Sequence, residues 1–410
     1  MDKIQLIFFF ISGFLVSRLI IKVKLPQRIV YWFVGKKHLS ITKILFYLIA
    51  TSAFLSFFIP NAITVLTLLP LLELLRRSYE KSNGSSRRMA TMLVLATIYG
   101  ANIGGMGSVT ATPANGILVT YAVLENVPGT SEISFASWLA WGIPLVAIFV
   151  CAAWSVLITI MRPWKLKAAS IQLPFQSADV YHPFQKTTIW LTIFYFISSF
   201  LLSLFLMRFS DQTNLILTLT GIITLIFILF LFFVPITGSG RNAPRQVLLT
   251  VPDCYNELPM KGFMFVAIAV VLAGLLYALN VHEFFPRWVR MIIPAHASTF
   301  FLFFTVAAAT SFSTEILSNT AVQISFFLMA LPLSQTLGVS SLAILVIITL
   351  SCTCAFMTPI ATGVNGLAFG GVKGVSLRKM LWVGFFMNIA GSLLISAWVL
   401  LVIGPMYNLN

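Results

Sequence analysis

Charged residues are scarce in this sequence. Only 9% of its 410 residues are Asp, Glu, Lys or Arg, while 59% are hydrophobic. A soluble domain carries about 25% charged residues, and a single hydrophobic core stops growing near about 250–300 residues. One soluble fold therefore could not hide this much apolar surface, and the composition excludes an ordinary soluble protein.

Residues that build metal centres and catalytic sites are also few. The four histidines stand singly in expected loops or at the ends of expected spans: His38, His182, His282 and His296. The four cysteines show no zinc-ligand spacing and are expected to be free, mostly buried thiols: Cys151, Cys254, Cys352 and Cys354. We therefore expect neither an enzymatic activity nor an organic cofactor.

Long hydrophobic runs are what the sequence has instead. The runs Ile189–Met207 and Leu381–Ile403 contain no charged residue and are long enough, as helices, to cross about 30 Å of hydrocarbon. The run Leu6–Val16 could be a signal peptide, but no small-residue cleavage site follows it and the next residues are basic, so we assign it to the first span. We predict an integral protein of a bacterial inner membrane, surrounded by lipid.

The formal charge of +15 is distributed in a way that is typical of membrane topology. Of the 26 Lys and Arg residues, 22 fall in five segments that we place on the inner side of the membrane. This excess follows the positive-inside rule, places both termini outside and gives no reason to expect a nucleic-acid partner. The five segments are Arg18–Lys43, Arg76–Arg88, Arg162–Lys186, Arg241–Lys261 and Lys373–Lys379.

Two long apolar stretches are interrupted near their middle. Residues 43–75 contain a Pro-Asn pair at 60–61, and residues 295–333 contain Ser-Asn-Thr at 318–320. Basic clusters flank both ends of the first stretch, so a tilted span would place one cluster outside, whereas a re-entrant hairpin keeps both inside. We predict an inner hairpin at 43–75 and an outer one at 295–333, each with its tip surrounded by protein or a wet cavity.

Two further apolar stretches, 89–124 and 342–369, are broken by glycine and proline. Four glycines lie within residues 100–107 and Pro113 follows them, while the second stretch carries a proline and two glycines within residues 359–366. Glycine and proline do not continue a helix well. Each stretch is therefore expected to form two half-helices with an unwound middle.

The two halves of the chain match each other. Asn61 corresponds to Asn319 at an offset of 258, and Thr112–Gly116 corresponds to Thr362–Gly366 at an offset of 250. The charge pattern places the start of one half outside the membrane and the start of the other half inside. We therefore predict an all-α polytopic membrane protein built from inverted repeats. Each repeat would contain a span, a hairpin, a broken helix and a final span. The repeats are residues 1–161 and 263–410, joined by a connector with two spans at 162–262.

Such repeats place a binding site at their interface, where discontinuous helices present free ends. A half-helix N-terminus offers unpaired N–H groups and about +0.5 charge to an anion, and unwound carbonyls and hydroxyls suit a small cation such as sodium. No Lys or Arg lies at any of the four breaks. A single break could equally be a kink or an interhelical hydrogen-bonding site, but four breaks in matched pairs favour a secondary transporter of a small anion.

Glu315 is the one carboxylate that we expect well inside the membrane. A carboxylate at this depth suggests a proton or cation site. The alternative is a structural group that accepts hydrogen bonds from backbone N–H groups of the hairpin. The sequence leaves both interpretations open.

Around these breaks the sequence resembles the divalent anion:sodium symporter family of the wider ion transporter superfamily. Residues 314–321, with their Ser-Asn-Thr, look like the family's second hairpin motif. Residues 357–365 are similar to its following unwound segment, and residues 102–115 to the equivalent segment of the first half. The resemblance implies a homodimer that carries di- or tricarboxylates, or sulfate, usually with sodium, by an elevator motion.

The resemblance also implies which residues contact the transported species. Those facing the substrate would be Asn61, Thr112, Pro113, Asn319, Thr320 and Thr362. One sodium ion would lie near Ser56, Asn61, Asn102 and Gly105. A second would lie near Thr314, Leu317, Asn319, Ala361 and Gly363, largely through carbonyl oxygens.

The sequence departs from the family pattern in three places. The first tip reads Pro60-Asn61-Ala62 where the family has Ser-Asn-Thr, and Gly363 replaces a proline. The first half also lacks scaffold helices that usually precede the hairpin. An arsenite-type oxyanion transporter, a sodium/proton transporter, and a membrane enzyme or receptor on the same scaffold therefore stay open as alternatives.

Overall fold

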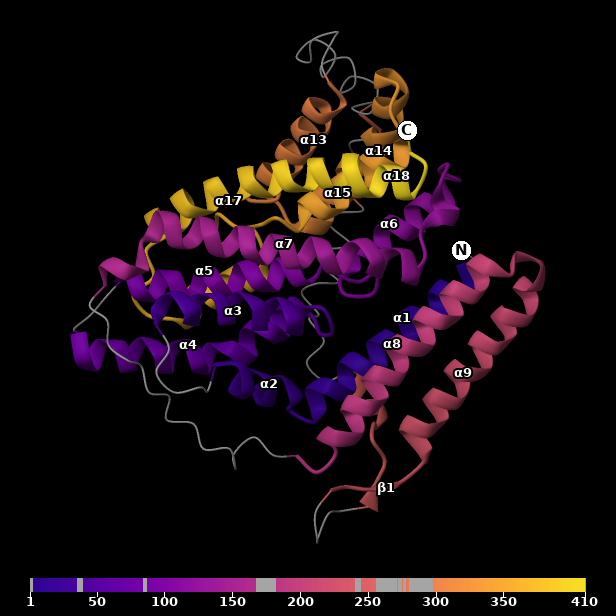
Figure 1. Ribbon diagram of the computed structural model, residues 1–410, viewed down its shortest axis with the longest axis horizontal. Coiled ribbons are helices and arrows are strands. Elements are labelled where there is room, and N and C mark those ends of the chain that lie inside the picture. Colours follow the sequence, from indigo (N-terminus) through magenta and orange to yellow (C-terminus); the bar gives the residue numbers. More distant parts are fainter. Residues whose placement is uncertain are drawn as a thin grey trace.

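The structure is a computed structural model that describes residues 3–34, 40–83, 87–166, 182–239, 245–255 and 298–409, with four single positions between 271 and 279. Helices dominate this part of the chain (Figure 1). The span expected to end at Leu279 and the aromatic segment expected after it lie almost wholly outside the described residues.

Seven α-helices form the first part of the chain. Ser40 caps the third of them by accepting from Lys43 N–H, and Ser134 opens the seventh with a reciprocal capping box. Such caps satisfy backbone N–H groups that have no partner within the helix. The helices are α1 (Lys3–Lys22), α2 (Leu25–Val34), α3 (Ile41–Ser56), α4 (Asn61–Asn83), α5 (Arg87–Gly104), α6 (Pro113–Leu124) and α7 (Phe135–Met161), with 3-10 turns at Thr130–Glu132 and Pro163–Lys165.

The middle of the chain contains two long helices, α8 (Gln185–Arg208) and α9 (Thr213–Phe233), with a 3-10 turn between them at Ser210–Gln212. Both lie within residues 162–262, where two spans were predicted. Both lie beside α1, and α8 also packs against α7 (Figure 1). A small antiparallel pair that the sequence did not predict follows, with strands β1 (Ile236–Thr237) and β2 (Arg245–Gln246), and then the short helix α10 (Val251–Tyr255).

Asp253 attaches α10 to the end of α1. Its carboxylate lies 2.7 Å from Lys22 Nζ, and its backbone carbonyl accepts from Arg18 Nε at 2.8 Å. Burial alone would raise the pKa of Asp253, but the hydrogen bonds from Lys22 and Thr250 outweigh it and hold the pKa below its usual value. The connector is therefore fixed to α1 by an ionised carboxylate at neutral pH.

The last part of the chain repeats the order of the first. A long helix again ends at a break, and a short helix again follows an unwound segment. The elements are α13 (Thr299–Ser313), α14 (Asn319–Leu337), α15 (Ser341–Cys352), α16 (Gly363–Gly371), α17 (Leu377–Trp398), a π-helical turn (Val399–Ile403) and α18 (Gly404–Met406).

All four expected helix breaks are present. The first hairpin stretch breaks between Ser56 and Asn61, and the second between Ser313 and Asn319. The unwound segments cover residues 105–112 and 353–362. The predicted breaks are thus confirmed, whereas the re-entrant course of the two hairpins and the inverted relation of the halves stay predictions.

Helix α5 lies at the centre of the first part, where every residue from Met89 to Gly104 is buried. Its glycines allow α3 to approach closely. A Cβ atom at Gly100 would lie 2.3 Å from the carbonyl oxygen of Ile49, and one at Gly104 would lie 2.1 Å from that of Ala53. Because a packed interior has no room for such an overlap, only glycine fits at these two positions.

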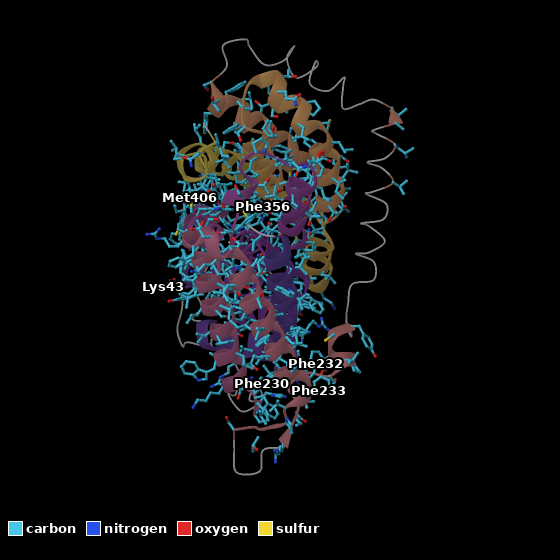
Figure 2. All side chains as sticks on the ribbon, turned by 90° about the vertical axis from the view of Figure 1, so that its right-hand side faces the viewer. Lys43, Phe230, Phe232, Phe233, Phe356 and Met406 are labelled. Atoms are coloured by element: carbon cyan, nitrogen blue, oxygen red, sulfur yellow. The ribbon has the colours of Figure 1, made fainter. Side chains whose placement is uncertain are left out.

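The outer helices differ from α5 because they expose apolar side chains. Phe356 is fully buried, whereas Phe233, at the end of α9, is 71% exposed (Figure 2). Cys151, which we expected to be buried, is exposed on α7. Among the described residues, five helical stretches are long and apolar enough to cross a membrane: Phe135–Lys165, Gln185–Arg208, Thr213–Phe233, Asn319–Leu337 and Leu377–Met406.

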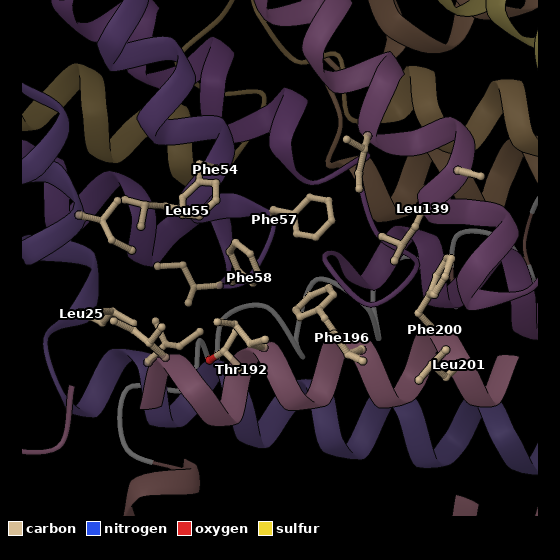
Figure 3. Close-up of a pocket in the computed structure, with 18 residues that line it drawn as sticks. Leu25, Phe54, Leu55, Phe57, Phe58, Leu139, Thr192, Phe196, Phe200 and Leu201 are labelled. Carbon is tan, nitrogen blue, oxygen red and sulfur yellow. The ribbon is translucent and has the colours of Figure 1, made fainter. Parts of the chain in front are cut away.

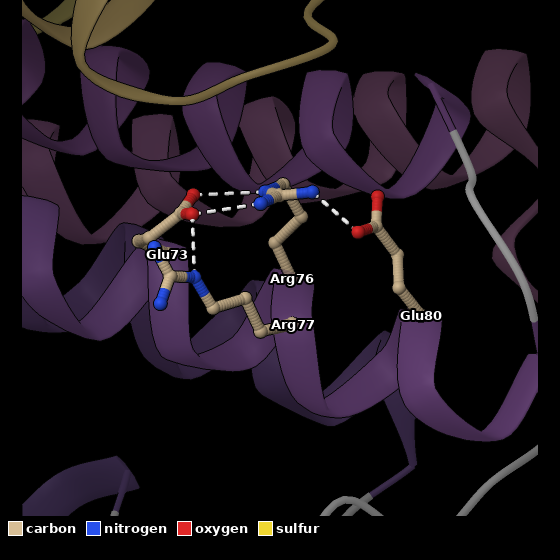
Figure 4. Close-up of polar contacts among 4 residues, drawn as sticks. All are labelled: Glu73, Arg76, Arg77 and Glu80. Atoms are coloured by element: carbon tan, nitrogen blue, oxygen red, sulfur yellow. Dashed lines mark hydrogen bonds and ion pairs between the residues drawn. The ribbon is translucent and has the colours of Figure 1, made fainter.

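The polar end of α4 carries a cluster of ion pairs (Figure 4). Arg76 bonds Glu73 through two nitrogens, at 2.7 and 2.8 Å, and also bonds Glu80 one turn further along. Arg77 Nε reaches Glu73 as well, at 2.8 Å. Because these i,i+3 and i,i+4 contacts satisfy the charges within one helix, the cluster stabilises this end of α4 and offers no sign of a ligand site.

Candidate functional site

A buried asparagine holds the first unwound segment. Asn115 Nδ2 donates to the backbone carbonyl of Gly105 at 2.9 Å and to that of Ser108 at 2.7 Å. Both carbonyls lie where the regular helix is interrupted, and Ser108 also accepts from the N–H of Ala111 at 3.1 Å. Because a buried carbonyl needs a hydrogen-bond donor, the Asn115 amide helps to fix the shape of residues 105–112.

The same arrangement recurs 250 residues later. Asn365 Nδ2 donates to the carbonyls of Ala355 at 2.9 Å and Thr358 at 2.8 Å. The asparagine and both acceptors are each displaced by 250 from those of the first half. The sequence comparison had aligned the two asparagines without giving them a role, and their side-chain direction is visible only in the structure.

Two buried oxygens near the first tip have no protein partner. Asn61, at the start of α4, donates from Nδ2 to Asn102 Oδ1 at 3.5 Å, but its Oδ1 accepts no hydrogen bond, and neither does Thr112 Oγ1. A Cβ atom at Gly105 would lie 2.4 Å from Thr112 Cγ2 and 3.5 Å from Asn61 Oδ1. Four of the predicted site residues of the first half are thus close together, around oxygens that could serve a cation or a donor.

Ser56, which was predicted to lie near a sodium ion, forms a hydrogen bond with another side chain. Its Oγ donates to Thr64 Oγ1 at 3.0 Å, and both side chains are buried. This hydrogen bond ties the end of α3 to the first turns of α4 across the break. The structure thus gives the predicted sodium residue Ser56 a clear role in shaping the tip.

At the second tip, Thr314 lies within hydrogen-bonding distance of two acceptors. Its Oγ1 is 2.6 Å from Asn319 Oδ1 and 3.1 Å from the carbonyl of Cys352. Thr362 caps α16 by accepting from Asn365 N–H at 3.1 Å. The remaining predicted residues vary in exposure: Ala361 is buried, Thr320 is half-buried, and Leu317 and Gly363 are exposed.

Glu315 joins the second tip to the unwound segment behind it. Its Oε1 accepts from the N–H groups of Phe356 at 2.7 Å and Met357 at 2.8 Å, and from Asn388 Nδ2 at 2.8 Å. Its Oε2 accepts from Thr358 N–H at 2.7 Å, and Thr358 Oγ1 donates back to the Glu315 carbonyl at 2.6 Å. All four partners of the carboxylate are donors, as an ionised carboxylate requires. This geometry favours the structural interpretation of Glu315.

The first tip is held in a different way. The residue 258 positions before Glu315 is Phe57. Its ring lies against Gly107, where a Cβ atom would be 2.5 Å from Phe57 Cδ2, and 5.6 Å from the ring of Phe196 on α8. Aromatic packing on α8 thus takes the place that the carboxylate has in the second half.

Hydrogen bonds connect the two halves at the centre of the molecule. Asn102 Nδ2, from the first half, donates to the carbonyl of Ala355 at 2.8 Å. Gln323 Nε2, on α14, donates to the carbonyl of Ala114 at 2.8 Å and to Thr349 Oγ1 at 3.0 Å. The start of α6 is therefore joined directly to α14, and the end of α5 is joined to the second unwound segment.

A cavity of about 230 Å³ lies beside the first tip. Its walls include Thr112 and Pro113 from the predicted site, Pro60 beside the predicted Asn61, and Tyr195 from α8. None of the predicted residues of the second half is among its lining residues. This cavity therefore belongs to the first half, and Asn102 links that half to the Ala355 carbonyl in the second unwound segment.

Comparison with known proteins identifies related membrane transporters. A protein of Staphylococcus saprophyticus named sodium-dependent dicarboxylate transporter SdcS is 23% identical over 416 aligned residues, which cover 99% of this chain and 78% of the relative. The protein of the same name in Staphylococcus aureus is 24% identical over 404 residues, covering 95% and 75%. Residues 3–407 match the family described as the sodium:sulfate symporter transmembrane region. Because this match spans nearly the whole chain, the protein belongs to that family of membrane transporters.

Proposed function

We propose that this protein is a secondary transporter that moves a small di- or tricarboxylate together with sodium across a bacterial plasma membrane. Family membership and the names of the two relatives support this function. The structural observation that carries the proposal is the pair of buried oxygens without partners, Asn61 Oδ1 and Thr112 Oγ1, at a helix break. A bound substrate or sodium ion would supply the partner that these oxygens lack.

The proposed anion site lies where four helices begin. The first turns of α4, α6, α14 and α16 would direct backbone N–H groups at the substrate, and their dipoles favour a negative charge. No Lys or Arg occurs in the unwound segments 105–112 and 353–362. The substrate would therefore be held by neutral donors, from which it can be released. The residues proposed to contact it are Asn61, Thr112, Pro113, Asn319, Thr320 and Thr362.

Sodium is proposed to bind at two places. The first is formed by Ser56, Asn61, Asn102 and Gly105, and the second by Thr314, Leu317, Asn319, Ala361 and Gly363. The partnerless Oδ1 of Asn61 supports the first site. The contact of Thr314 Oγ1 with Asn319 Oδ1 supports the second, because it brings two of the proposed ligands together.

The proposed architecture is a pair of inverted repeats, residues 1–161 and 263–410, with re-entrant hairpins at 43–75 and 295–333. The helix breaks and the matching asparagine contacts 250 residues apart support it. In a homodimer with this architecture, the hairpins and broken helices would move as one body against α1, α8 and α9. Such an elevator motion would carry the site from one side of the membrane to the other.

Uptake by proteoliposomes tests the function. We expect an inward sodium gradient, but not a potassium gradient, to drive accumulation of labelled succinate in liposomes that contain the full chain. Unlabelled sulfate and succinate, added in separate competition assays, identify the preferred anion. Succinate uptake that is equal in sodium and potassium would contradict sodium coupling.

A substitution at the second tip tests the site. Replacing Asn319 with Ala removes a proposed ligand of both anion and sodium, and we expect it to abolish uptake while leaving the melting temperature without sodium nearly unchanged. The matched control is Asn214→Ala at an exposed position on α9, which should transport like the wild type. Full uptake by the Asn319 variant would remove the site assignment.

A further inference from the structure

A large apolar crevice separates the end of α3 from α8 (Figure 3). Its volume is about 800 Å³, within the range of roughly 300–1,000 Å³ that is usual for small-molecule sites. Phe54, Phe57 and Phe58 form one wall, while Phe196 and Phe200 of α8 form the opposite one. The crevice adjoins the smaller cavity that contains Thr112, because Phe57, Phe58 and Phe196 line both, but Thr112 lines only the smaller one.

The lining of the crevice excludes a charged or strongly polar occupant. Thr192 is its one polar residue, and Thr192 Oγ1 already donates to the carbonyl of Thr188 at 2.8 Å. An anion in the crevice would lose its hydration and gain no hydrogen bond, at a cost of several kcal/mol or more. The occupant must therefore be a hydrocarbon chain or another apolar group.

The crevice is continuous with the surface that faces lipid. Helix α8 is a candidate membrane span, and only 17% of its most apolar stretch is buried inside the molecule. Its residues Ile189, Ile193, Ile197 and Leu201 line the crevice and are 39–55% exposed, so the crevice is open to the surroundings. Phe54, on the opposite wall, is 45% exposed. An acyl chain of the surrounding bilayer can therefore enter from the side.

Positive charge lies at one end of the crevice. Leu25 and Ile29 of α2 line that end, and Lys24 and Arg28, which are both exposed, are their neighbours in the chain. Arg28 Nη1 donates to Gln185 Oε1 at 2.8 Å, which holds the guanidinium at the first turn of α8. The positive-inside rule places these residues at the cytoplasmic surface, where anionic headgroups bind to basic residues between helices.

We propose that this crevice binds an anionic phospholipid, with an acyl chain between the first hairpin tip and α8 and the headgroup phosphate at Lys24 and Arg28. The apolar walls and the cationic end together match the two chemically different parts of one lipid. A bound lipid would fill the space beside Phe57 and Phe58. It would therefore set how closely the first tip packs on α8.

Lipid binding to the purified full chain tests the proposal. In detergent micelles, phosphatidylglycerol should bind saturably, remain attached in native mass spectrometry and raise the melting temperature, because a ligand of the folded state stabilises it. Phosphatidylcholine with the same acyl chains should have a much smaller effect, and glycerol phosphate, which has no acyl chain, should have none. Equal effects of the two phospholipids would overturn the headgroup assignment.

Variants of each end of the crevice make the test specific. Lys24→Gln and Arg28→Gln should each weaken phosphatidylglycerol binding about fivefold, as expected for one charge at a membrane surface. Lys165→Gln, at an exposed position that does not line the crevice, is the matched control and should bind normally. Ala140→Trp should fill the crevice, since Ala140 is an exposed lining residue, and reduce binding of both lipids. Unchanged binding by the Lys24 and Ala140 variants would overturn the proposal.

Discussion

Glu315 is the residue whose role changes most once the structure is considered. A carboxylate inside a membrane protein suggests ion or proton coupling, but this one accepts hydrogen bonds from three consecutive backbone N–H groups and Asn388. Its three backbone partners lie in the unwound segment 353–362, next to the proposed second sodium site, and Asn388 lies on α17. We interpret Glu315 as a positioning residue that holds this segment against the hairpin tip.

Replacing Glu315 with Gln tests that role. The amide nitrogen of Gln would face N–H donors and leave at least one of them unsatisfied, which costs about 1–3 kcal/mol. We expect a clearly lower melting temperature in the absence of sodium and a weaker sodium-dependent increase. Glu125→Gln changes an exposed carboxylate on the loop after α6 and should leave both values unchanged. A Glu315 variant that melts like the wild type but loses coupling would instead support an ion-carrying role.

For single residues, the sequence predicts which positions matter better than it predicts their hydrogen-bond partners. The matched positions of Asn61 and Asn319, or of Asn115 and Asn365, can be read from spacing alone. The direction of each side chain depends on how the unwound backbone folds around it and, for Glu315, on packing between segments that are 41 to 73 residues apart in the chain. The backbone acceptors of Asn115 and Asn365, and the donors to Glu315, therefore became clear only from the structure.

The helices themselves follow the sequence closely. Glycine, proline and polar residues interrupt apolar runs that would otherwise continue, so all four breaks could be predicted within a few residues. The β1–β2 pair was missed because two-residue strands carry no periodic signal. Helix α5 also shows that burial is not evident from an apolar run alone, since its complete enclosure depends on the close approach of α3.

Gly104 tests the close approach of α3 and α5. In Gly104→Ala the new Cβ would overlap the carbonyl of Ala53, and the helices would have to separate. Overpacking of this kind typically costs about 1–3 kcal/mol, so we expect a lower melting temperature and less monodisperse protein on size-exclusion chromatography.

Gly370 is the matched control for this substitution. A Cβ atom there meets nothing within 4 Å, and Ala is favoured over Gly in a helix by about 1 kcal/mol. Gly370→Ala in α16 should therefore be neutral or slightly stabilising. If the Gly104 variant were as stable as the Gly370 variant, the tight packing of α3 on α5 would not be required for folding.

Considered as a whole, the molecule fixes its two tips in unequal ways. The second is held by a carboxylate and backbone hydrogen bonds, and the first by aromatic packing on α8. Aromatic contacts constrain direction less than multiple hydrogen bonds do, so the first tip is better suited to slide along α8. The first tip also borders the proposed lipid site, where the bilayer composition could influence its position.

The course of the chain through the membrane is the prediction on which the transport mechanism depends most. Lys43 and Arg77, at the two ends of the first hairpin, are both exposed. In a variant without native cysteines, a single cysteine at either position should react with a membrane-impermeant maleimide only from the cytoplasmic side, because a re-entrant hairpin begins and ends on one side. Asp211→Cys, in the turn between α8 and α9, is the control and should react only from outside. Labelling of positions 43 and 77 from opposite sides would mean that α3 and α4 together cross the membrane, and the first tip could not then lie at a site shared with the second.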